Sequence, residues 1–250
     1  MVNAQQWLEQ NYPANGTCIN KDDKENYGKR REEIINLDIS NRNLSGSLNS
    51  KGWTNLRKMN FSFNQLTGGD VGRDNWPVME ELDWSYNQFG KGGYVWGVHL
   101  FPQLRKLNLS NNIIQMLDLS KANQLTHLNV SNNLNLGGVY LSSGELVELD
   151  CSNNSALTTL SLPNFSNLKF FDIRGTNITE MNVISSSPAS PTSSIPVTTT
   201  TIFATINGSV NNSHSLIPGL IAGIVSETFL AIAIVLCVRA NYTGKWKIWK

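Results

Sequence analysis

The chain has 250 residues, a formal net charge of +1 and 40% hydrophobic residues, which are distributed unevenly along the sequence. No stripe of lysine and arginine accompanies this near-neutral balance, so the composition argues against a protein that binds nucleic acid. The uneven hydrophobicity also means that length alone does not give the number of domains.

Residues 1–33 are expected to cap a larger domain. The segment AQQWLEQNY (4–12) has the pattern of a short amphipathic helix that covers the open edge of the next unit. The charged run KDDKENYGKRREE (21–33) is typical of a solvated loop. Residues 1–33 contain no apolar run of the kind found in signal peptides.

Residues 34–182 contain one recurring phrase, as in LRKMNFSFNQL, LRKLNLSNNII and LTHLNVSNNLN. It reads L-x-x-L-x-L-x-x-N-x-L, the unit of a leucine-rich repeat, and it recurs every 21 to 25 residues. Its first apolar positions are Ile34, Leu56, Met79, Leu104, Leu125, Leu146 and Leu168. The pattern predicts an α/β solenoid of about seven repeats with short parallel strands.

The apolar positions of each unit should face the interior, because side chains alternate along a strand. In this repeat class the asparagine after each strand joins a ladder that satisfies backbone groups. The ladder candidates are Asn64, Asn87, Asn112, Asn133 and Asn154. A second apolar stripe is expected on the opposite wall, at Trp53, Trp76, Phe101, Ala122 and Phe165, with Ser143 as the exception.

The outward positions of the predicted strands are mostly small and polar. One column consists of Asp38, Asn60, Asp83, Asn108, Asn129, Asp150 and Asp172. Aromatic side chains interrupt this surface on two adjacent units and in a glycine-rich insert, residues 90–97, and aromatic residues on a rigid polar surface are typical interface anchors. We therefore expect ligand contacts from Phe63, Tyr86, Tyr94 and Trp96 and from the charged residues Lys58, Glu81 and Lys106. The alternative is that the aromatic residues only close the solenoid where the insert bulges.

Residues 183–215 contain nine Ser, six Thr and three Pro, and no Asp, Glu, Lys or Arg. Such a segment cannot bury enough apolar surface to order itself. Tracts of this composition are typical of O-glycosylated stalks, and an unmodified disordered linker is the alternative.

Residues 216–238, LIPGLIAGIVSETFLAIAIVLCV, predict a single transmembrane helix. At about 1.5 Å per residue such a helix crosses a hydrocarbon layer of about 30 Å. The basic tail, 239–250, follows it, so the positive-inside rule predicts a cytoplasmic C-terminus and extracellular repeats at the plasma membrane. Gly219, Gly223 and Glu227 lie on one i, i+4 line, which predicts helix association into a homo- or hetero-oligomer. A lone helix that tolerates a neutral glutamate is the alternative.

No catalytic constellation is recognisable, and no His or Cys pair has metal-ligand spacing, so we expect neither an enzyme nor a cofactor or metal. The three cysteines, Cys18, Cys151 and Cys237, form no disulfide framework. Several N-x-S/T sequons are by-products of the repeat phrase. N-glycosylation is therefore expected chiefly at Asn15, Asn207 and Asn211.

The succession of repeats, Ser/Thr/Pro-rich stalk, single span and basic tail resembles leucine-rich-repeat receptor-like membrane proteins. The opening AQQWLEQNYP and the units NVSNN and DCSNN also resemble leucine-rich-repeat families of root-symbiotic fungi. The resemblance implies a right-handed solenoid that binds proteins or peptides. We therefore expect a membrane-anchored recognition module, a receptor or co-receptor without its own catalytic domain. The alternatives are a tail-anchored scaffold with cytosolic repeats and a cell-wall or adhesion protein.

Overall fold

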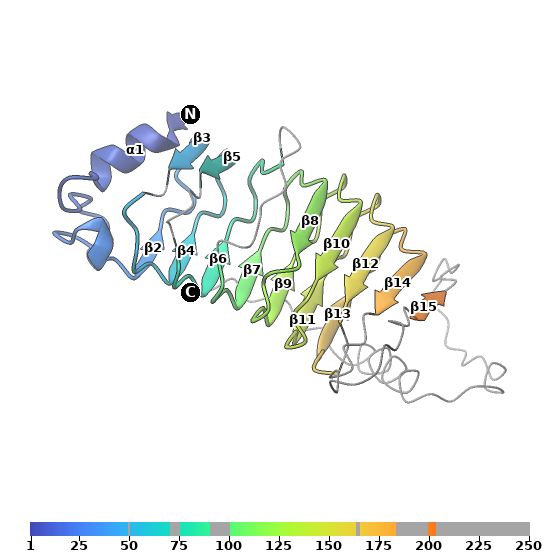
Figure 1. The fold of residues 1–250 in the computed structure, drawn as a ribbon. Helices are drawn as coiled ribbons and strands as arrows, with labels where there is room; N and C mark the ends of the chain where they lie inside the picture. Colours follow the sequence, from blue (N-terminus) through green and yellow to red (C-terminus); the bar gives the residue numbers. More distant parts are fainter. Residues whose placement is uncertain (50, 71–75, 91–100, 164–165, 184–199, 204–250) are drawn as a thin grey trace, which may run out of the picture.

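The computed structural model describes residues 1–49, 51–70, 76–90, 101–163, 166–183 and 200–203. Over these residues the chain winds into a parallel β-solenoid of about five complete turns. Figure 1 shows the elongated coil, with the N-terminal helix at one end and the last turns at the other.

Seven short strands form the first wall of the solenoid, one from each predicted repeat. They are β2 (Asn36–Asp38), β4 (Lys58–Asn60), β6 (Glu81–Asp83), β7 (Lys106–Asn108), β9 (His127–Asn129), β11 (Glu148–Asp150) and β13 (Phe170–Asp172). Neighbouring strands are parallel and in register, so that Leu37 lies beside Met59 and Leu82 beside Leu107. The central side chain of each strand is buried. The strand positions predicted from the repeat phrase are therefore confirmed.

Strands, not helices, form most of the opposite wall. They are β8 (Met116–Leu119), β10 (Gly138–Leu141), β12 (Thr159–Leu162) and β14 (Glu180–Val183), with β15 (Thr200–Phe203) antiparallel to β14. At the N-terminal end, β1 (Val2–Asn3), β3 (Leu44–Asn49) and β5 (Gln65–Asp70) form a separate sheet. The burial of β8 alternates residue by residue, which is the period of a strand.

The prediction of an α/β solenoid is thus right about the coil and its parallel strands and wrong about its helix content. Among the described residues the only α-helix is α1 (Ala4–Asn11), and a single 3-10 turn spans Arg31–Glu33. Within the predicted stalk, Thr200–Phe203 form β15. The rest of the stalk, 184–199 and 204–215, lies outside the described residues.

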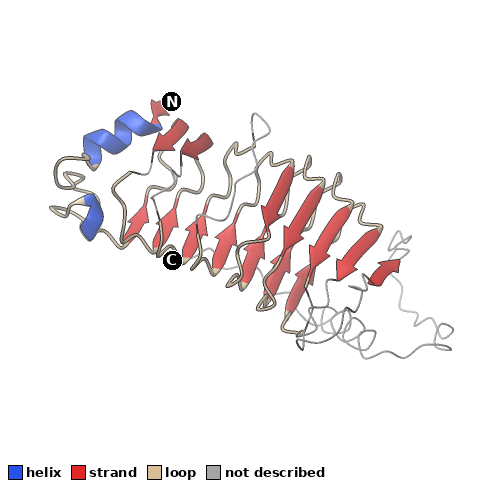
Figure 2. Cartoon of the chain, viewed as in Figure 1, coloured by secondary structure: helices blue, strands red, loops and turns tan. Residues whose placement is uncertain are grey.

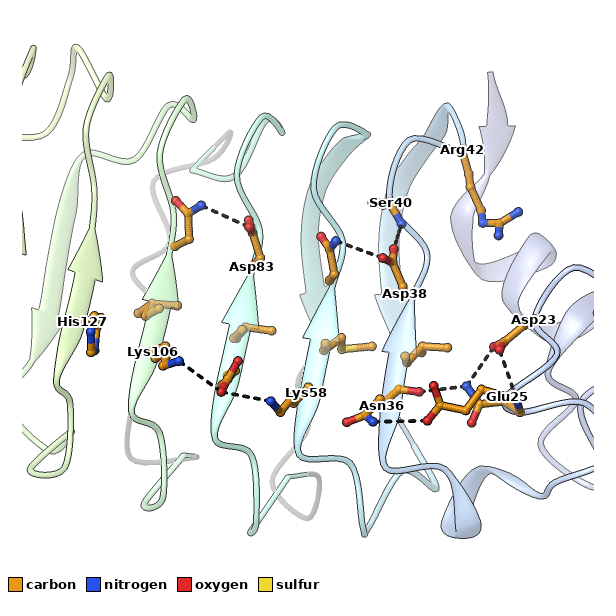
Figure 3. Close-up of a pocket in the computed structure, with 18 of the residues that line it drawn as sticks. Asp23, Glu25, Asn36, Asp38, Ser40, Arg42, Lys58, Asp83, Lys106 and His127 are labelled. Atoms are coloured by element: carbon orange, nitrogen blue, oxygen red, sulfur yellow. Dashed lines mark hydrogen bonds and ion pairs between the residues drawn. The ribbon is translucent and has the colours of Figure 1, made fainter. Parts of the chain in front are cut away.

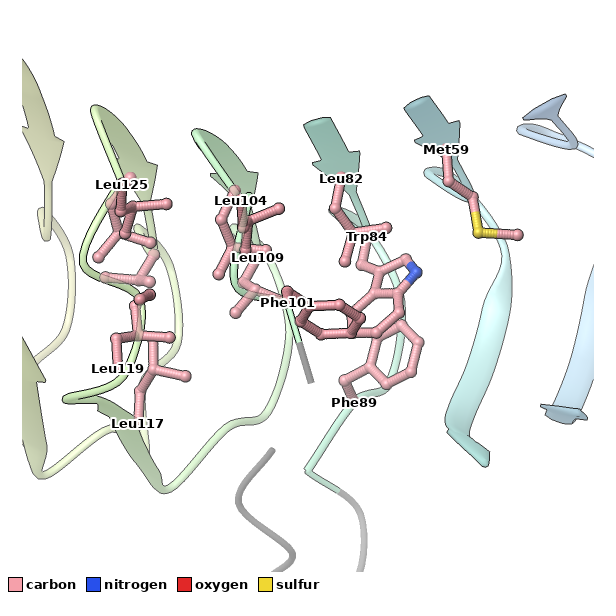
Figure 4. Close-up of a cluster of buried hydrophobic side chains, with 14 of the residues drawn as sticks. Met59, Leu82, Trp84, Phe89, Phe101, Leu104, Leu109, Leu117, Leu119 and Leu125 are labelled. Atoms are coloured by element: carbon pink, nitrogen blue, oxygen red, sulfur yellow. The ribbon is translucent and has the colours of Figure 1, made fainter. Parts of the chain in front are cut away.

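The apolar core runs between the two walls along the whole coil. Figure 4 shows leucines of successive turns in line beside Trp84, Phe89 and Phe101. The predicted second stripe is buried at Trp53, Trp76, Phe101 and Ala122, whereas Phe165 lies outside the described residues. Ser143 is buried as well, and its Oγ donates to the carbonyl of Leu125 at 2.7 Å. Stacking of turns makes this core continuous, and no single turn could bury its apolar face alone.

The N-terminal segment lies against the first turn of the coil (Figure 2). Asn3 is the N-cap of helix α1, and its Oδ1 accepts a hydrogen bond from the Gln6 N–H at 2.9 Å. The helix buries Ala4 and Leu8 against the core of the solenoid.

No helix within the described residues has the length and hydrophobicity needed to cross a membrane. The predicted span 216–238, which contains Gly219, Gly223 and Glu227, lies outside those residues, as does the predicted tail 239–250.

Candidate functional site

The outward column of Asp and Asn side chains is fixed by local hydrogen bonds. In every strand of the seven-stranded sheet, Oδ1 accepts from the backbone N–H two residues further on, as Asp38 does from Ser40 at 2.9 Å. Some side chains of this column also bond to the next strand: Asn60 Nδ2, for example, donates to Asp38 Oδ2 at 3.2 Å. The polar floor is therefore ordered before any ligand arrives, which lowers the entropy cost of binding.

The asparagine ladder predicted behind this column is confirmed. Asn112 is buried, and its Nδ2 donates to the carbonyls of Trp84 and Leu109 at 3.0 Å each. Its Oδ1 accepts from the Phe89 N–H at 2.9 Å. Equivalent bonds hold Asn64, Asn87, Asn133 and Asn154. The ladder ties each turn to the preceding one and so keeps the outward surface rigid.

The three charged residues expected to contact a ligand lie together on the sheet, and Figure 3 shows two of them, Lys58 and Lys106. Glu81 Oε1 lies 3.2 Å from Lys58 Nζ and 3.4 Å from Lys106 Nζ, so one carboxylate on β6 is bridged by lysines of both neighbouring strands. His127 follows on β9, with its Nε2 3.9 Å from Glu148 Oε1. Burial is the main cause that lowers the pKa of His127, and nearby Lys106 lowers it further, while Glu148 opposes both.

A groove of about 610 Å³ lies over this sheet. Its floor comes from the first five strands, β2 to β9, and includes Asn36, Asp38, Lys58, Asn60, Glu81, Asp83, Lys106, Asn108 and His127. One end is closed by the loop of the N-terminal cap, through Asp22, Asp23, Glu25 and Asn26. The sequence indicated a solvated loop here, and no local pattern identified it as a wall of the site.

Hydrogen bonds hold this cap loop against the first strand. Asn26 Nδ2 donates to the carbonyl of Asn36 at 2.8 Å and to Asp23 Oδ2 at 2.9 Å. The Tyr12 hydroxyl also donates to Asp23 Oδ2, at 2.6 Å. Burial, together with this contact, raises the pKa of Tyr12, so the hydroxyl keeps its proton. The end of the groove is thus a fixed surface.

Phe63 and Tyr86 form a stacked pair just beyond the C-terminal ends of β4 and β6. Their ring centroids are 4.2 Å apart and the ring planes differ by 10°. They are 43% and 47% exposed, although stacking on each other covers one face of each ring. Both have a positive φ, 55° and 54°, in the left-handed region that non-glycine residues rarely adopt. The pair stands on the same two turns that supply Lys58 and Glu81, but it does not line the groove itself.

The structure leaves some of the predicted site untested. Tyr94 and Trp96 lie outside the described residues, as do the sequons at Asn207 and Asn211. Asn15 is exposed in a turn of the cap, where a glycan has room.

The sequons that fall on the polar floor are engaged in hydrogen bonds. Asn60 Oδ1, for example, accepts from the Ser62 Oγ at 2.7 Å, and Asn129 makes the equivalent bond to Ser131. A glycan on either side chain would occupy the surface of the sheet.

Burial affects the ionisation of two aspartates in the outward column. Desolvation raises the pKa of Asp83, and the charge of Asp38 adds to this effect. Desolvation likewise raises the pKa of Asp150, and the neighbouring Asp172 raises it further. Hydrogen bonds from Ser85 and Ser152 oppose these shifts. The floor therefore holds negative charge at an energetic cost.

Cys18 and Cys151 are both buried free thiols. Within the described residues no group of His, Cys, Asp or Glu side chains is arranged to hold a metal ion. Comparisons with family models, with curated proteins and with solved structures found no match to this chain.

Proposed function

We propose that this chain is a leucine-rich-repeat recognition module that binds a protein or peptide across its seven-stranded sheet. In this proposal it is anchored by residues 216–238 and acts as a receptor or co-receptor without its own catalytic domain. The observation that carries the proposal is an ordered polar groove with an exposed, backbone-strained aromatic pair on the same turns.

Two physical features support recognition over a purely structural role. A rigid floor loses little entropy on binding, and flat aromatic side chains supply most of the binding energy in many interfaces. Strained backbone at Phe63 and Tyr86 costs free energy, and such strain is concentrated at functional sites. The seven equivalent repeats do not require an aromatic residue at this position, because five of them have Asn or Gly there.

The test is partner capture by the full chain and by a Phe63→Asn/Tyr86→Asn variant. Asparagine is the matched replacement, because it occupies the same left-handed position at Asn111, Asn132 and Asn153. A photo-crosslinker placed at Gln65, beside the pair, should trap a defined partner. We expect the double variant to reduce the yield on the order of tenfold or more, as for loss of an interface hot spot.

The control is Tyr140→Asn on β10, since Tyr140 is 38% exposed on the opposite wall. It should leave the yield unchanged. Equal capture by the wild type and the Phe63/Tyr86 variant would contradict a role for the pair, and absence of any Gln65 adduct would contradict recognition on this surface.

A tail-anchored cytosolic scaffold remains the second candidate, and one observation favours it. Asn60, Asn108 and Asn129 are sequons on the polar floor, and N-glycans there would obstruct binding in the secretory lumen. In the cytosol they would stay unmodified. The location of the repeats therefore decides between the two candidates.

A further inference from the structure

Four exposed apolar side chains lie in four consecutive repeats, beside the asparagine ladder. Phe63 and Tyr86 directly precede the ladder asparagine of the second and third repeats, and Ile113 and Leu134 directly follow it in the fourth and fifth. Ile113 is 38% exposed and Leu134 is 64% exposed. Because the ladder bonds hold these repeats in register, the four side chains form one strip along the coil, which we call the apolar rim.

The two rows of positions that flank the ladder carry no charge in any of the seven repeats. Outside the apolar rim they hold only Asn, Gln, Ser or Gly, at Asn41, Asn43, Gln65, Gln88, Asn111, Asn132, Asn153, Ser155, Gly175 and Asn177. A charged group of a partner would lose hydration here and gain no ion pair from these rows. Nor do the rows offer the lysine and arginine with which proteins bind anionic membrane surfaces. The complementary surface is therefore uncharged and apolar.

Backbone hydrogen bonds in the row before the ladder are already formed between turns. The Phe63 N–H donates to the Ser85 carbonyl at 3.1 Å, and the Tyr86 N–H donates to the Ser110 carbonyl at 2.9 Å. The equivalent N–H groups of Asn41, Asn111, Asn132 and Asn153 bond to the next turn in the same way. A ligand in an extended conformation would therefore find no donor in this row for strand pairing. An α-helix satisfies its own backbone and can bind through side chains alone.

The spacing of the apolar rim also matches the pitch of an α-helix. Adjacent turns of the coil are about 4.8 Å apart, so three steps carry the rim about 14 Å along the coil. The change from the position before the ladder to the position after it adds up to about 7 Å across the coil. The rim is therefore roughly 16 Å long, which is the length of three helical turns of about 5.4 Å each.

We infer that the apolar rim binds the apolar face of an uncharged amphipathic helix in a partner protein, through side chains at i, i+4, i+7 and i+11. The inference rests on the proposed recognition function and specifies the ligand of the surface around Phe63 and Tyr86. Each side chain of the helix faces one repeat, and the stacked rings of Phe63 and Tyr86 support the first two. The ladder fixes these repeats before binding, which lowers the entropy cost.

The test compares two labelled, uncharged peptides by fluorescence anisotropy. The full chain is held in neutral phosphatidylcholine nanodiscs, and empty nanodiscs are the blank. One peptide consists of Ala and Gln with Leu at i, i+4, i+7 and i+11. The other has the same leucines and a proline in place of a central Gln, which breaks the helix. We expect the helical peptide to bind at least about tenfold more tightly than the proline peptide.

The decisive variant is Ile113→Gln/Leu134→Gln, which should lose the preference for the helical peptide. Glutamine is the matched replacement, because it occupies the same position at Gln65 and Gln88. The control is Ile35→Gln. Ile35 is also an exposed apolar residue, at 47%, but it precedes β2 and so lies at the other end of the strands. This variant should keep the preference.

Three results of the peptide assay would overturn the inference: equal binding of both peptides by the wild type, binding of neither, or an unchanged preference in Ile113→Gln/Leu134→Gln. A wild-type dimer that this variant converts to a monomer, without a peptide preference, would assign the apolar rim to a second copy. Adsorption of the wild type but not of the variant to added neutral phosphatidylcholine vesicles, again without a preference, would assign it to lipid. Either assignment would replace the helix.

Partner capture at Gln65 uses no designed peptide, so the two hypotheses can fail separately. Capture that depends on Phe63 and Tyr86 but not on Ile113 and Leu134 would refute only the helix assignment. Absence of capture would refute the proposed function.

Discussion

One backbone position, three residues after each strand of the seven-stranded sheet, has a left-handed conformation in all seven repeats. Asparagine or glycine occupies it in five turns, at Asn41, Asn111, Asn132, Asn153 and Gly175. These residues tolerate a positive φ because their side chains are short or absent. Phe63 and Tyr86 are the exceptions, and the left-handed backbone conformation of each costs about 1 kcal/mol or more of folding free energy. Stacking of the two rings stabilises the fold by about 1 kcal/mol, which is less than the combined strain of the two residues. Stability alone therefore does not explain the pair.

The outward column allows a matched test of charge against hydrogen bonding. Asp150 accepts from the Ser152 N–H and Oγ, as Asn129 does from the same atoms of Ser131. Asp150→Asn should therefore keep the bonds and remove the buried charge. Since burial raises the pKa of Asp150 in the folded state, the wild type loses stability as pH rises above the ordinary aspartate pKa. We predict that the variant is more stable than the wild type at pH 7 in urea titrations.

The advantage of Asp150→Asn should disappear below about pH 3, where Asp150 is protonated in both the folded and the unfolded states. Asp118→Asn serves as a control with the opposite sign. Hydrogen bonds from Ser120 lower the pKa of Asp118, so its charge stabilises the fold at neutral pH and that stabilisation is lost as pH falls. A pH-independent difference between wild type and Asp150→Asn would show that the charge is not the cause.

At the scale of elements, one buried arginine joins three parts of the cap and coil. Arg31 Nε donates to the Tyr12 carbonyl at 2.7 Å, Nη1 donates to the Lys51 carbonyl at 3.1 Å, and Nη2 pairs with Glu9 at 2.7 Å. Its guanidinium also lies 5.3 Å from the Trp53 ring centre. Because the cap loop closes the groove, this arginine supports the site without lining it.

We predict that Arg31→Ala lowers the free energy of unfolding of the cap by about 2–4 kcal/mol, because it leaves two carbonyls without donors and removes packing on Trp53. Hydrogen exchange should then accelerate in Ala4–Asn11 and in the 21–33 loop more than in β9 or β11. Arg30→Ala is the control, since that side chain is 67% exposed and should change stability by less than about 0.5 kcal/mol. Uniform acceleration along the chain would mean that the cap and the coil unfold as one unit.

At the scale of the molecule, the supporting hydrogen bonds are the same in every repeat, whereas the candidate functional features occur in only some of the repeats. The ladder and the outward hydrogen bonds repeat along the coil, whereas the aromatic pair occurs in two repeats only and the groove covers five of the seven strands, from the cap to β9. In a solenoid each turn contacts only its neighbours, so a site can be built at one end without changing the rest.

N-glycosylation at one exposed sequon can show whether the repeats face the secretory lumen or the cytosol. In the receptor proposal we predict that the full chain, expressed in eukaryotic cells, migrates faster on a gel after enzymatic glycan removal. Asn15→Gln should make that shift smaller by one glycan, because Asn15 is exposed in the cap. Asn135→Gln, an exposed residue outside any sequon, should leave the shift unchanged. Absence of a shift in the wild type would favour the cytosolic scaffold.

The sequence by itself determined the repeating part of this protein. The seven in-register strands, the inward leucines and the asparagine ladder follow from residue type and spacing within one unit, and identical units stack identically. It also identified Lys58, Glu81 and Lys106 as neighbours, because residues one repeat apart occupy the same place on adjacent strands.

Only the tertiary structure decided the features that do not repeat from one unit to the next. It built much of the opposite wall from the strands β8, β10, β12 and β14, and it brought the 21–33 loop against β2 to close the groove. It also showed that Phe63 and Tyr86 stack outside the groove, at a strained backbone position. These features depend on contacts between segments that differ in sequence and are made only when the coil is assembled, so no pattern within a single repeat encodes them.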